Sequence, residues 1–321
     1  MNSRLPISGT LAAALTASLL LGHNNGVISG KNSVPLGVTT GYPSCGSCHN
    51  ATASSVVHVD ITSAASVAPG ANVPMKLSVA DNTTYTRGGF EMETSAGTFV
   101  ASANTWTDKT VRGVEAITHN DSLSRAWSFS WTAPTTPGLV TMTAVGNAAD
   151  GDDKEKGDNW GWYGSDATLP GVPYRIFVNE ASIVSAGDGC TGADGFKPVL
   201  GIAKAPAVNG TWDTEAYNLP VGTPTIAILG LSNTFFGALP LPLPLKGIGG
   251  GDCVLRVSLD VMQVAITAGR GAGGGSARTT WLVPNDTTLR GLKLHFQQMT
   301  VDSKANTFGF SFSNALTATI Q

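Results

Sequence analysis

The chain of 321 residues is long enough for one large domain or two ordinary ones, and 42% of its residues are hydrophobic, as in most folded proteins. Charged residues make up only 13% and the net charge is −3, so the sequence lacks the basic surface that general nucleic-acid binding needs. Glycine is abundant, with 39 residues, whereas the residues that favour long helices are scarce. The composition therefore predicts an all-β, weakly charged protein and excludes a general nucleic-acid binder.

The N-terminus, residues 1–30, carries the pattern of an export signal. Arg4 is followed by an apolar run from Thr10 to Leu21, which is too short to span a membrane and has the length of a signal-peptide core. The polar stretch that follows favours export over the alternative, a buried N-terminal helix. We expect cleavage between Gly22 and Gly30 and no membrane span in the mature chain. The protein is therefore expected in the periplasm, at the cell surface or outside the cell.

The most specific motif is Cys45-Gly46-Ser47-Cys48-His49, within a segment of residues 31–54. The C-x-x-C-H pattern is typical of covalent c-type haem attachment. Two thiols three positions apart can reach two vinyl groups on one edge of the porphyrin, and His49 then lies under the iron as the proximal ligand. The sequence therefore predicts haem c bound by Cys45, Cys48 and His49.

Other uses of these two cysteines remain open. A thioredoxin-like redox motif needs a βαβ context, and a zinc site needs a second Cys/His pair at ligand spacing; the sequence shows neither. A plain disulfide or a structural metal site in an exported protein is the remaining alternative.

A second axial ligand on the iron would be a histidine or a methionine. His119, at the end of an expected strand, shares a face with Ile117 and is the first distal candidate. His58 lies in the alternating segment 55–62 and is the second candidate, with a solvent-facing role as its alternative. His295 belongs to a later region and is expected on the surface. Core packing is expected for three methionines in alternating segments: Met75, Met92 and Met142.

Residues 55–181 are expected to form a β-sandwich. Short alternating segments follow one another, separated by turns rich in Gly and Pro. Trp127, Phe129 and Trp131 lie on one face of an expected strand, which is typical of a sandwich core.

This region also resembles a known family. The residues that carry the resemblance are Cys45–His49, Gly88-Gly-Phe90, Ile117-Thr-His119, Trp127-Ser-Phe-Ser-Trp-Thr-Ala-Pro134 and Ala144-Val-Gly-Asn-Ala-Ala-Asp-Gly151. Together they resemble the bacterial exported reelin-type (reeler-like) proteins, often called choice-of-anchor proteins, over about residues 40–180. The resemblance implies a β-sandwich at the cell exterior, a haem suspected from the motif, and a Thr-His pair at the position of Thr118-His119. No hydrophobic sorting helix with a basic tail follows Leu316, so anchoring by that route is not expected.

An acidic segment, Asp150 to Asp158, contains four Asp and one Glu. Such oxygens can bind Ca²⁺, but the spacing does not match an EF-hand and two lysines offset the charge. A solvated hairpin loop is the favoured interpretation. Trp160, Trp162 and Tyr163 follow directly, and a place over the core is favoured over covering a haem edge or binding a sugar.

Residues 187–321 are expected to form a second β-sandwich. Cys190 and Cys253 are the remaining cysteines, and an oxidising compartment favours a disulfide between them over two buried thiols. The region resembles a C-terminal β-domain of unknown function that is common in exported proteins of planctomycete-type and myxobacterial-type bacteria. The glycine-rich segment 269–276 lacks the Gly-Lys-Ser/Thr of a phosphate-binding loop and is expected to be a hairpin connection.

No hydrolase or protease motif is found, and five histidines offer little acid–base machinery, so the sequence favours a protein that is not an enzyme. Three hypotheses follow. The first is an exported monohaem c-type cytochrome-like protein with a redox partner protein that the sequence does not identify. The second is a surface adhesion or structural protein in which the C-x-x-C is a disulfide. The third is a haem enzyme such as a peroxidase.

Overall fold

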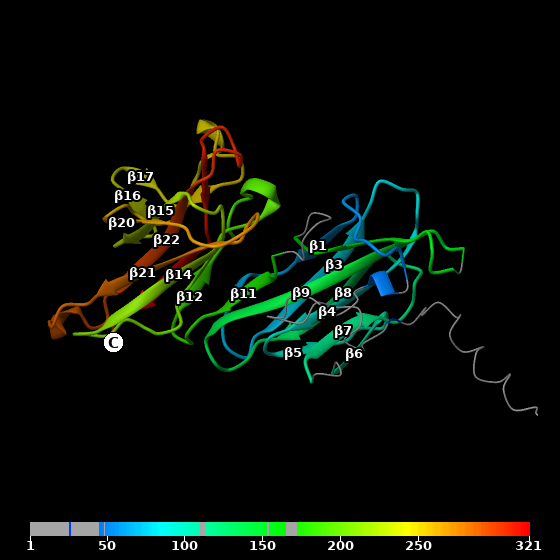
Figure 1. The fold of residues 1–321 in the computed structure, drawn as a ribbon. Coiled ribbons are helices and arrows are strands. Elements are labelled where there is room, and N and C mark those ends of the chain that lie inside the picture. Colours follow the sequence, from blue (N-terminus) through cyan, green and yellow to red (C-terminus); the bar gives the residue numbers. More distant parts are fainter. Residues whose placement is uncertain (1–25, 27–44, 48, 110–112, 153, 165–171) are drawn as a thin grey trace, which may run out of the picture.

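The structure, a computed structural model, describes residue 26 and residues 45–47, 49–109, 113–152, 154–164 and 172–321 (Figure 1). Apart from residue 26, the expected N-terminal segment 1–30 lies outside the described residues, as does Cys48. Within them the chain forms strands β1 to β24 and four short 3₁₀ turns, with no α-helix, so the all-β prediction is confirmed. None of the described residues lies in a helix long and apolar enough to cross a membrane.

The first eleven strands form two sheets that pack face to face. The four-stranded sheet has the order β1 (His58–Thr62), β3 (Asn72–Ala80), β8 (Ala126–Thr132), β5 (Thr98–Val100). The seven-stranded sheet has the order β2 (Ser66–Val67), β11 (Tyr174–Val178), β9 (Gly138–Ala149), β4 (Arg87–Thr94), β7 (Glu115–His119), β6 (Thr105–Lys109), and β10 (Asn159–Trp162) pairs with β9.

The core of this sandwich lies between the two sheets. Trp127, Phe129 and Trp131 alternate along β8 and are buried, as expected for a strand with one core face. At Gly146 the two sheets approach closely, because a Cβ at this position would clash with the side chain of Val79. The methionines expected in the core are all buried there: Met75, Met92 and Met142. Each large side chain buried in this way stabilises the fold by about 1.5–3 kcal/mol.

The second half of the chain forms two further sheets and two short ribbons. The six-stranded sheet has the order β12 (Val184–Ala186), β24 (Ala315–Thr319), β22 (Lys293–Val301), β15 (Pro224–Gly230), β20 (Val261–Ile266), and β23 (Phe310–Phe312) pairs with β22. The three-stranded sheet has the order β13 (Val199–Gly201), β14 (Thr211–Leu219), β21 (Gly275–Leu282). The ribbons are β16 (Phe235–Phe236) with β17 (Leu239–Pro240), and β18 (Leu243–Pro244) with β19 (Val254–Leu255). The 3₁₀ turns are η1 (Cys45–Ser47), η2 (Ala193–Gly195), η3 (Lys246–Ile248) and η4 (Thr287–Leu289).

Aromatic packing and a disulfide stabilise this half. The rings of Trp212 and Trp281 stack at 6.4 Å, and Phe296 lies 6.0 and 5.9 Å from them. Cys190 and Cys253, 63 positions apart, form a buried disulfide, which confirms the predicted pairing.

His295 is buried, with 6% of its surface exposed, so its expected surface position was wrong. β22 lies inside the six-stranded sheet, and its side chains are covered on both faces. An alternating sequence pattern cannot separate such a strand from a half-exposed one. The ring Nδ1 lies 2.9 Å from the Thr317 hydroxyl, and burial, with a smaller effect of Lys293, lowers the pKa of His295.

The two halves contact one another where β11 meets β13. Figure 1 shows β11 at the junction between the halves. Phe177 is fully buried and packs directly on Gly201, where a Cβ would clash with the ring, and it stacks on Tyr217 at 6.3 Å. Arg175 donates to the Asn218 side chain and to the Gly273 carbonyl, both at 3.0 Å. Glycine at position 201 therefore permits the close approach of the two halves.

Candidate haem-attachment site

The described residues of the C-x-x-C-H motif, Cys45–Ser47 and His49, lie in a tight turn against the seven-stranded sheet. Cys45 is half-buried and begins the turn η1, and the backbone N–H of His49 donates to the Cys45 carbonyl at 2.8 Å. A Cβ on Gly46 would lie 3.0 Å from the Trp160 ring of β10. Glycine at this position therefore lets the turn rest against the indole.

The imidazole of His49 is held through one nitrogen. Its Nδ1 lies 3.0 Å from the carbonyl oxygen of Glu155 and 3.1 Å from Oδ2 of Asp158. Because both neighbours only accept hydrogen bonds, the partners assign the proton to Nδ1, which then donates. The lone pair is therefore on Nε2, the arrangement in which a histidine binds a metal through Nε2.

Asp158 is fixed by the hairpin that joins β9 to β10. It is 3% exposed, its Oδ1 accepts from the Asp150 backbone N–H at 3.0 Å, and its Oδ2 accepts from the Asn147 amide at 3.4 Å. The acidic segment does form the connection between two antiparallel strands, but its last carboxylate is buried rather than solvated. The difference arises because the motif turn folds over the base of this hairpin, which a sequence pattern does not show.

Two charged residues of the loop, Asp152 and Lys154, are exposed and pair with one another. Asp152 accepts from the Lys154 backbone N–H at 2.8 Å and pairs with the Lys154 ammonium at 3.6 Å. Across the described residues, side chains spaced to hold a metal ion occur at Cys190, Asp252 and Cys253, where both sulfurs are already joined in the disulfide.

Trp160 connects the motif segment to the sheet. Its Nε1 donates to the Asn50 carbonyl at 2.6 Å, its own carbonyl accepts from the Ser54 N–H at 2.7 Å, and its ring meets Trp162 edge-on at 5.6 Å. The indole is 4% exposed. Its burial comes from the residues around the motif, so Trp160 packs against the candidate site and not over the sandwich core, where it was expected.

His119 lies at the same end of the seven-stranded sheet as His49. On β9, Asn147 pairs with Trp160 of β10 on one side and with Gly89 of β4 on the other. The His119 ring lies against Gly89. Adjacent strands are about 4.8 Å apart and β7 lies two strands beyond β9, so His119 and Asn147 are separated by at least about 10 Å across the sheet. The first distal candidate and the carboxylate that holds His49 therefore lie at the same end of the sheet.

The His119 Nδ1 faces the backbone of β4. It lies 3.0 Å from the Phe90 nitrogen, which donates to it, 3.2 Å from the Phe90 carbonyl and 3.3 Å from the Thr118 hydroxyl. The ring is 6.3 Å from the Phe90 ring and 6.0 Å from the Trp127 ring. The hydrogen-bonding contacts at Nδ1 and the packing against the two aromatic rings together fix the orientation of the His119 ring.

His58 lies elsewhere. It begins β1 in the four-stranded sheet, where its side chain is exposed while Val59 beside it is buried in the core. The structure therefore places His49 and His119 beside the seven-stranded sheet and His58 on the outer face of the other one.

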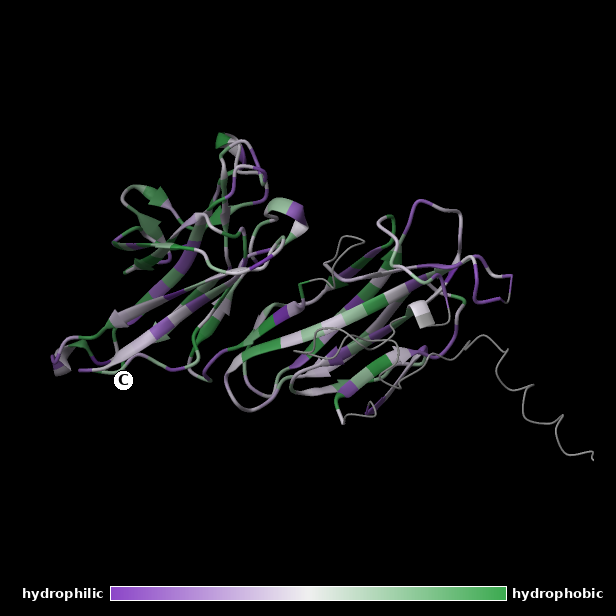
Figure 2. Cartoon of the chain, viewed as in Figure 1, coloured by the Kyte–Doolittle hydropathy of each residue, from purple (hydrophilic) through white to green (hydrophobic). Residues whose placement is uncertain are grey.

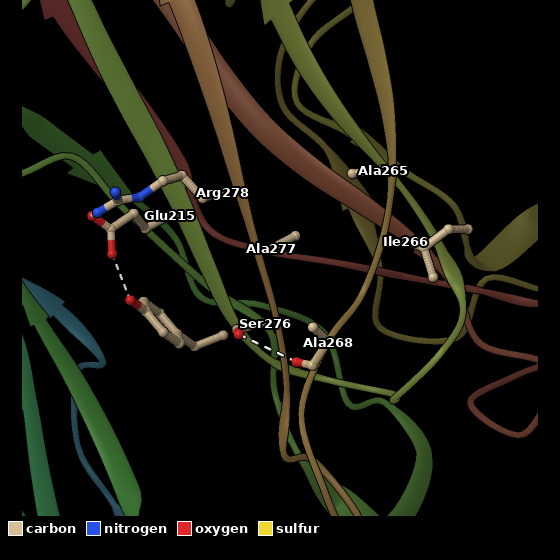
Figure 3. Close-up of a pocket in the computed structure, with 8 residues that line it drawn as sticks. Glu215, Ala265, Ile266, Ala268, Ser276, Ala277 and Arg278 are labelled. Atoms are coloured by element: carbon tan, nitrogen blue, oxygen red, sulfur yellow. Dashed lines mark hydrogen bonds and ion pairs between the residues drawn. The ribbon is translucent and has the colours of Figure 1, made fainter.

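A cavity of about 390 Å³ lies in the second half of the chain, between β14, β20 and β21 (Figure 3). Its polar groups are paired with each other: Arg278 donates to Glu215 at 2.9 Å, and the Tyr217 hydroxyl donates to the same carboxylate at 2.5 Å. Because these charges are already satisfied, the cavity presents no reactive group and is not part of the candidate site.

A scan against models of known protein families finds no match to the chain, and a search of curated proteins finds no relative. The sequence identified His49 but not its partners. The Asp158 carboxylate holds the His49 ring, and the Asn147 amide donates to that carboxylate. A weak signal was present, because Asp158 directly precedes the aromatic strand Asn159–Trp162 at the end of a charged segment.

Proposed function

We propose that the chain is an exported, reelin-type protein that carries a single covalently attached haem c on Cys45, Cys48 and His49. Its role is electron transfer, or another haem-based redox function, at the cell exterior. The observation that supports this most is the environment of His49, whose Nδ1 donates to a carbonyl and a buried carboxylate.

The residues present suit such a group. Imidazole and two thiols at C-x-x-C-H spacing are the donor set of c-type haem. A histidine that binds a metal usually donates its other N–H to a carboxylate or a carbonyl, which fixes the ring and raises its basicity. Bound haem would supply one-electron chemistry. In the chain, Asp158 and Asn147 orient His49, and Trp160 holds the turn on the sheet.

His119 is the proposed second axial ligand, because the sheet brings it to the same end as His49. Its Nδ1 accepts from the Phe90 N–H, so binding through Nε2 would require Nδ1 to donate instead to the Phe90 carbonyl, 3.2 Å away. His58 is the second candidate, and its exposed position on the other sheet makes it the natural control. Ligation by His119 fits electron transfer, whereas an open sixth position fits ligand sensing or turnover of peroxide.

The test is a spectrum of the full chain produced in a bacterium that attaches haem outside the cytoplasm. The expected result is a pyridine haemochrome from covalently bound haem, lost when Cys45→Ala and Cys48→Ala are combined. His119→Ala should convert a low-spin spectrum to a high-spin one, and the matched change His58→Ala should leave it unaltered. A protein without a Soret band would overturn the proposal and leave the adhesion hypothesis, with Cys45 and Cys48 as a disulfide.

A further inference from the structure

β20 (Val261–Ile266) is an edge strand of the six-stranded sheet, where it pairs with β15 alone. Its sequence, Val-Met-Gln-Val-Ala-Ile, contains no charged residue. Met262 is 54% exposed, Val264 is 70% exposed and Ile266 is 63% exposed. These three side chains alternate with the others, so they form one apolar row on one face.

The other sheet edges among the described strands are protected. β2, β5, β12, β13 and β23 have two or three residues each, β1 and β6 carry Asp60 and Asp108, and β21 carries Arg278. The four-residue strand β10 is covered by the motif segment, since the Trp160 carbonyl accepts from Ser54. Short length, charge and cover are the usual devices that stop an edge strand from pairing with another chain. β20 has six residues and no charge, and it is covered only at its end, where Ala268 pairs with Ser276, and where the Gln263 side chain reaches the Thr280 carbonyl.

The free backbone groups of β20 belong to the same three residues. The Thr267 N–H donates to the Thr223 carbonyl, on the β15 side, whereas Ala268 exchanges two bonds with Ser276 on the opposite side. Successive residues of a strand direct their N–H and C=O groups to opposite edges. Met262, Val264 and Ile266 therefore direct theirs away from β15, up to the point where Ser276 closes the edge, beside the cavity at Ile266 and Ala268 (Figure 3).

Further exposed apolar residues lie at the beginning of the strand. The Leu231 N–H donates to the Asp260 carboxylate at 2.7 Å, and the Ser258 N–H donates to the Ser232 carbonyl at 2.8 Å, so the segment before β16 is tied to the residues before β20. Figure 2 shows hydrophobic colouring at β16, β17 and β20. The exposed residues are Leu231, Phe235, Phe236, Leu239, Val261, Met262, Val264 and Ile266. Together they expose on the order of 900 Å², close to the roughly 800 Å² that each partner buries in a standard interface.

We propose that two copies of this chain associate through β20, antiparallel about a two-fold axis at Val264. In this register Val264 lies opposite Val264 of the second copy, and Met262 lies opposite Ile266. Each of these pairs exchanges two backbone hydrogen bonds, and their side chains form an apolar row on one face. On the other face Gln263 lies opposite Ala265.

A second copy suits this edge better than a foreign strand for two reasons. The row Met262, Val264, Ile266 is complementary to itself when reversed, with no like charges brought together. The pairing also consumes the free edge of both copies, so the assembly closes as a dimer and does not extend into a fibre. The proposal does not depend on haem, because β20 lies in the other half of the chain.

The decisive test uses the residue on the axis. Val264→Lys and Val264→Asp each place like charges opposite each other, so each variant alone should lose association by at least 10-fold. A one-to-one mixture of the two variants should restore a dimer, because lysine then lies opposite aspartate. The measurement is the mass of the full mature chain by light scattering or sedimentation across a concentration series, together with circular dichroism to show that each variant folds.

Val184→Lys is the matched control. Val184 is 63% exposed on β12, the opposite edge of the same sheet, so this variant should associate like the wild type. The proposal is overturned if the wild type stays monomeric at all concentrations, if the single Val264 variants remain dimeric, or if their mixture stays monomeric. A monomer that binds an added uncharged β-strand peptide would overturn it in favour of a foreign strand. The mass is measured with and without haem, so failure here leaves the haem proposal untouched.

Discussion

Replacing Asp158 tests whether a buried carboxylate organises the motif turn. Its Oδ1 accepts from the Asp150 N–H at 3.0 Å, and its Oδ2 lies 3.1 Å from the His49 Nδ1 and 3.4 Å from the Asn147 amide. A hydrogen bond to a charged group contributes about 1.5–3 kcal/mol, and a buried donor left without its acceptor adds to the cost. The contact with the Asn147 amide, at 3.4 Å, is long and contributes little to stability. We therefore expect Asp158→Ala to destabilise the hairpin by about 3 kcal/mol.

Asp158→Asn keeps the shape and an acceptor oxygen but removes the charge, so its cost should be about half as large. Hydrogen exchange of haem-free protein, followed by mass spectrometry on a peptide that covers residues 147–160, reports this local stability. A loss of about 3 kcal/mol makes exchange about 100-fold faster, and half that loss makes it about 10-fold faster.

Asp152→Ala is the matched control, because Asp152 lies in the same loop with an exposed carboxylate paired to Lys154. Exposed ion pairs contribute little, so exchange should change by less than 3-fold or so. If Asp158→Ala exchanges no faster than Asp152→Ala, the buried carboxylate does not organise the hairpin and the reasoning is wrong.

Three further predictions concern the second half of the chain and its contact with the first. Gly201→Ala forces a methyl group into the phenylalanine ring of β11 and should cost about 1–3 kcal/mol in thermal unfolding, whereas Gly247→Ala, with open space around it, should cost far less. Removing the disulfide with Cys190→Ser and Cys253→Ser should lower stability to urea by about 4 kcal/mol, from the loop of 63 positions; an unchanged midpoint would refute this. Burial lowers the pKa of His295 below 6.5, so the unfolded chain binds the extra proton first. The protein is therefore more stable above pH 6.5, and it loses this stability as the pH falls below 6.5. His295→Gln should flatten the slope of the free energy of unfolding against pH, measured by urea titrations at pH 5 to 7.

The all-β fold, the strand pattern of the first sandwich and the disulfide could be predicted from composition, alternation and cysteine counting. These features depend on local pattern or on the oxidising environment, and both are visible in a sequence. His295 shows where the pattern fails, because alternation does not reveal that β22 is covered on both faces.

The candidate site was only partly predictable. The motif named Cys45 and His49 through their spacing, but the partners of His49 lie about a hundred positions away, and they are brought together by the β9–β10 hairpin. Asp158 looked like one more solvated carboxylate, since its burial depends on the turn that packs over it. Long-range contacts of this kind follow from strand register and not from composition.

The intact mass of the mature chain, produced in a host that attaches haem, tests the central claim most directly. The account predicts the mass of the chain plus one haem, retained after denaturation and acid extraction, and absent when Cys45 and Cys48 are both replaced by alanine. A chain of unmodified mass, or one lighter only by the two hydrogens of a Cys45–Cys48 disulfide, would contradict it.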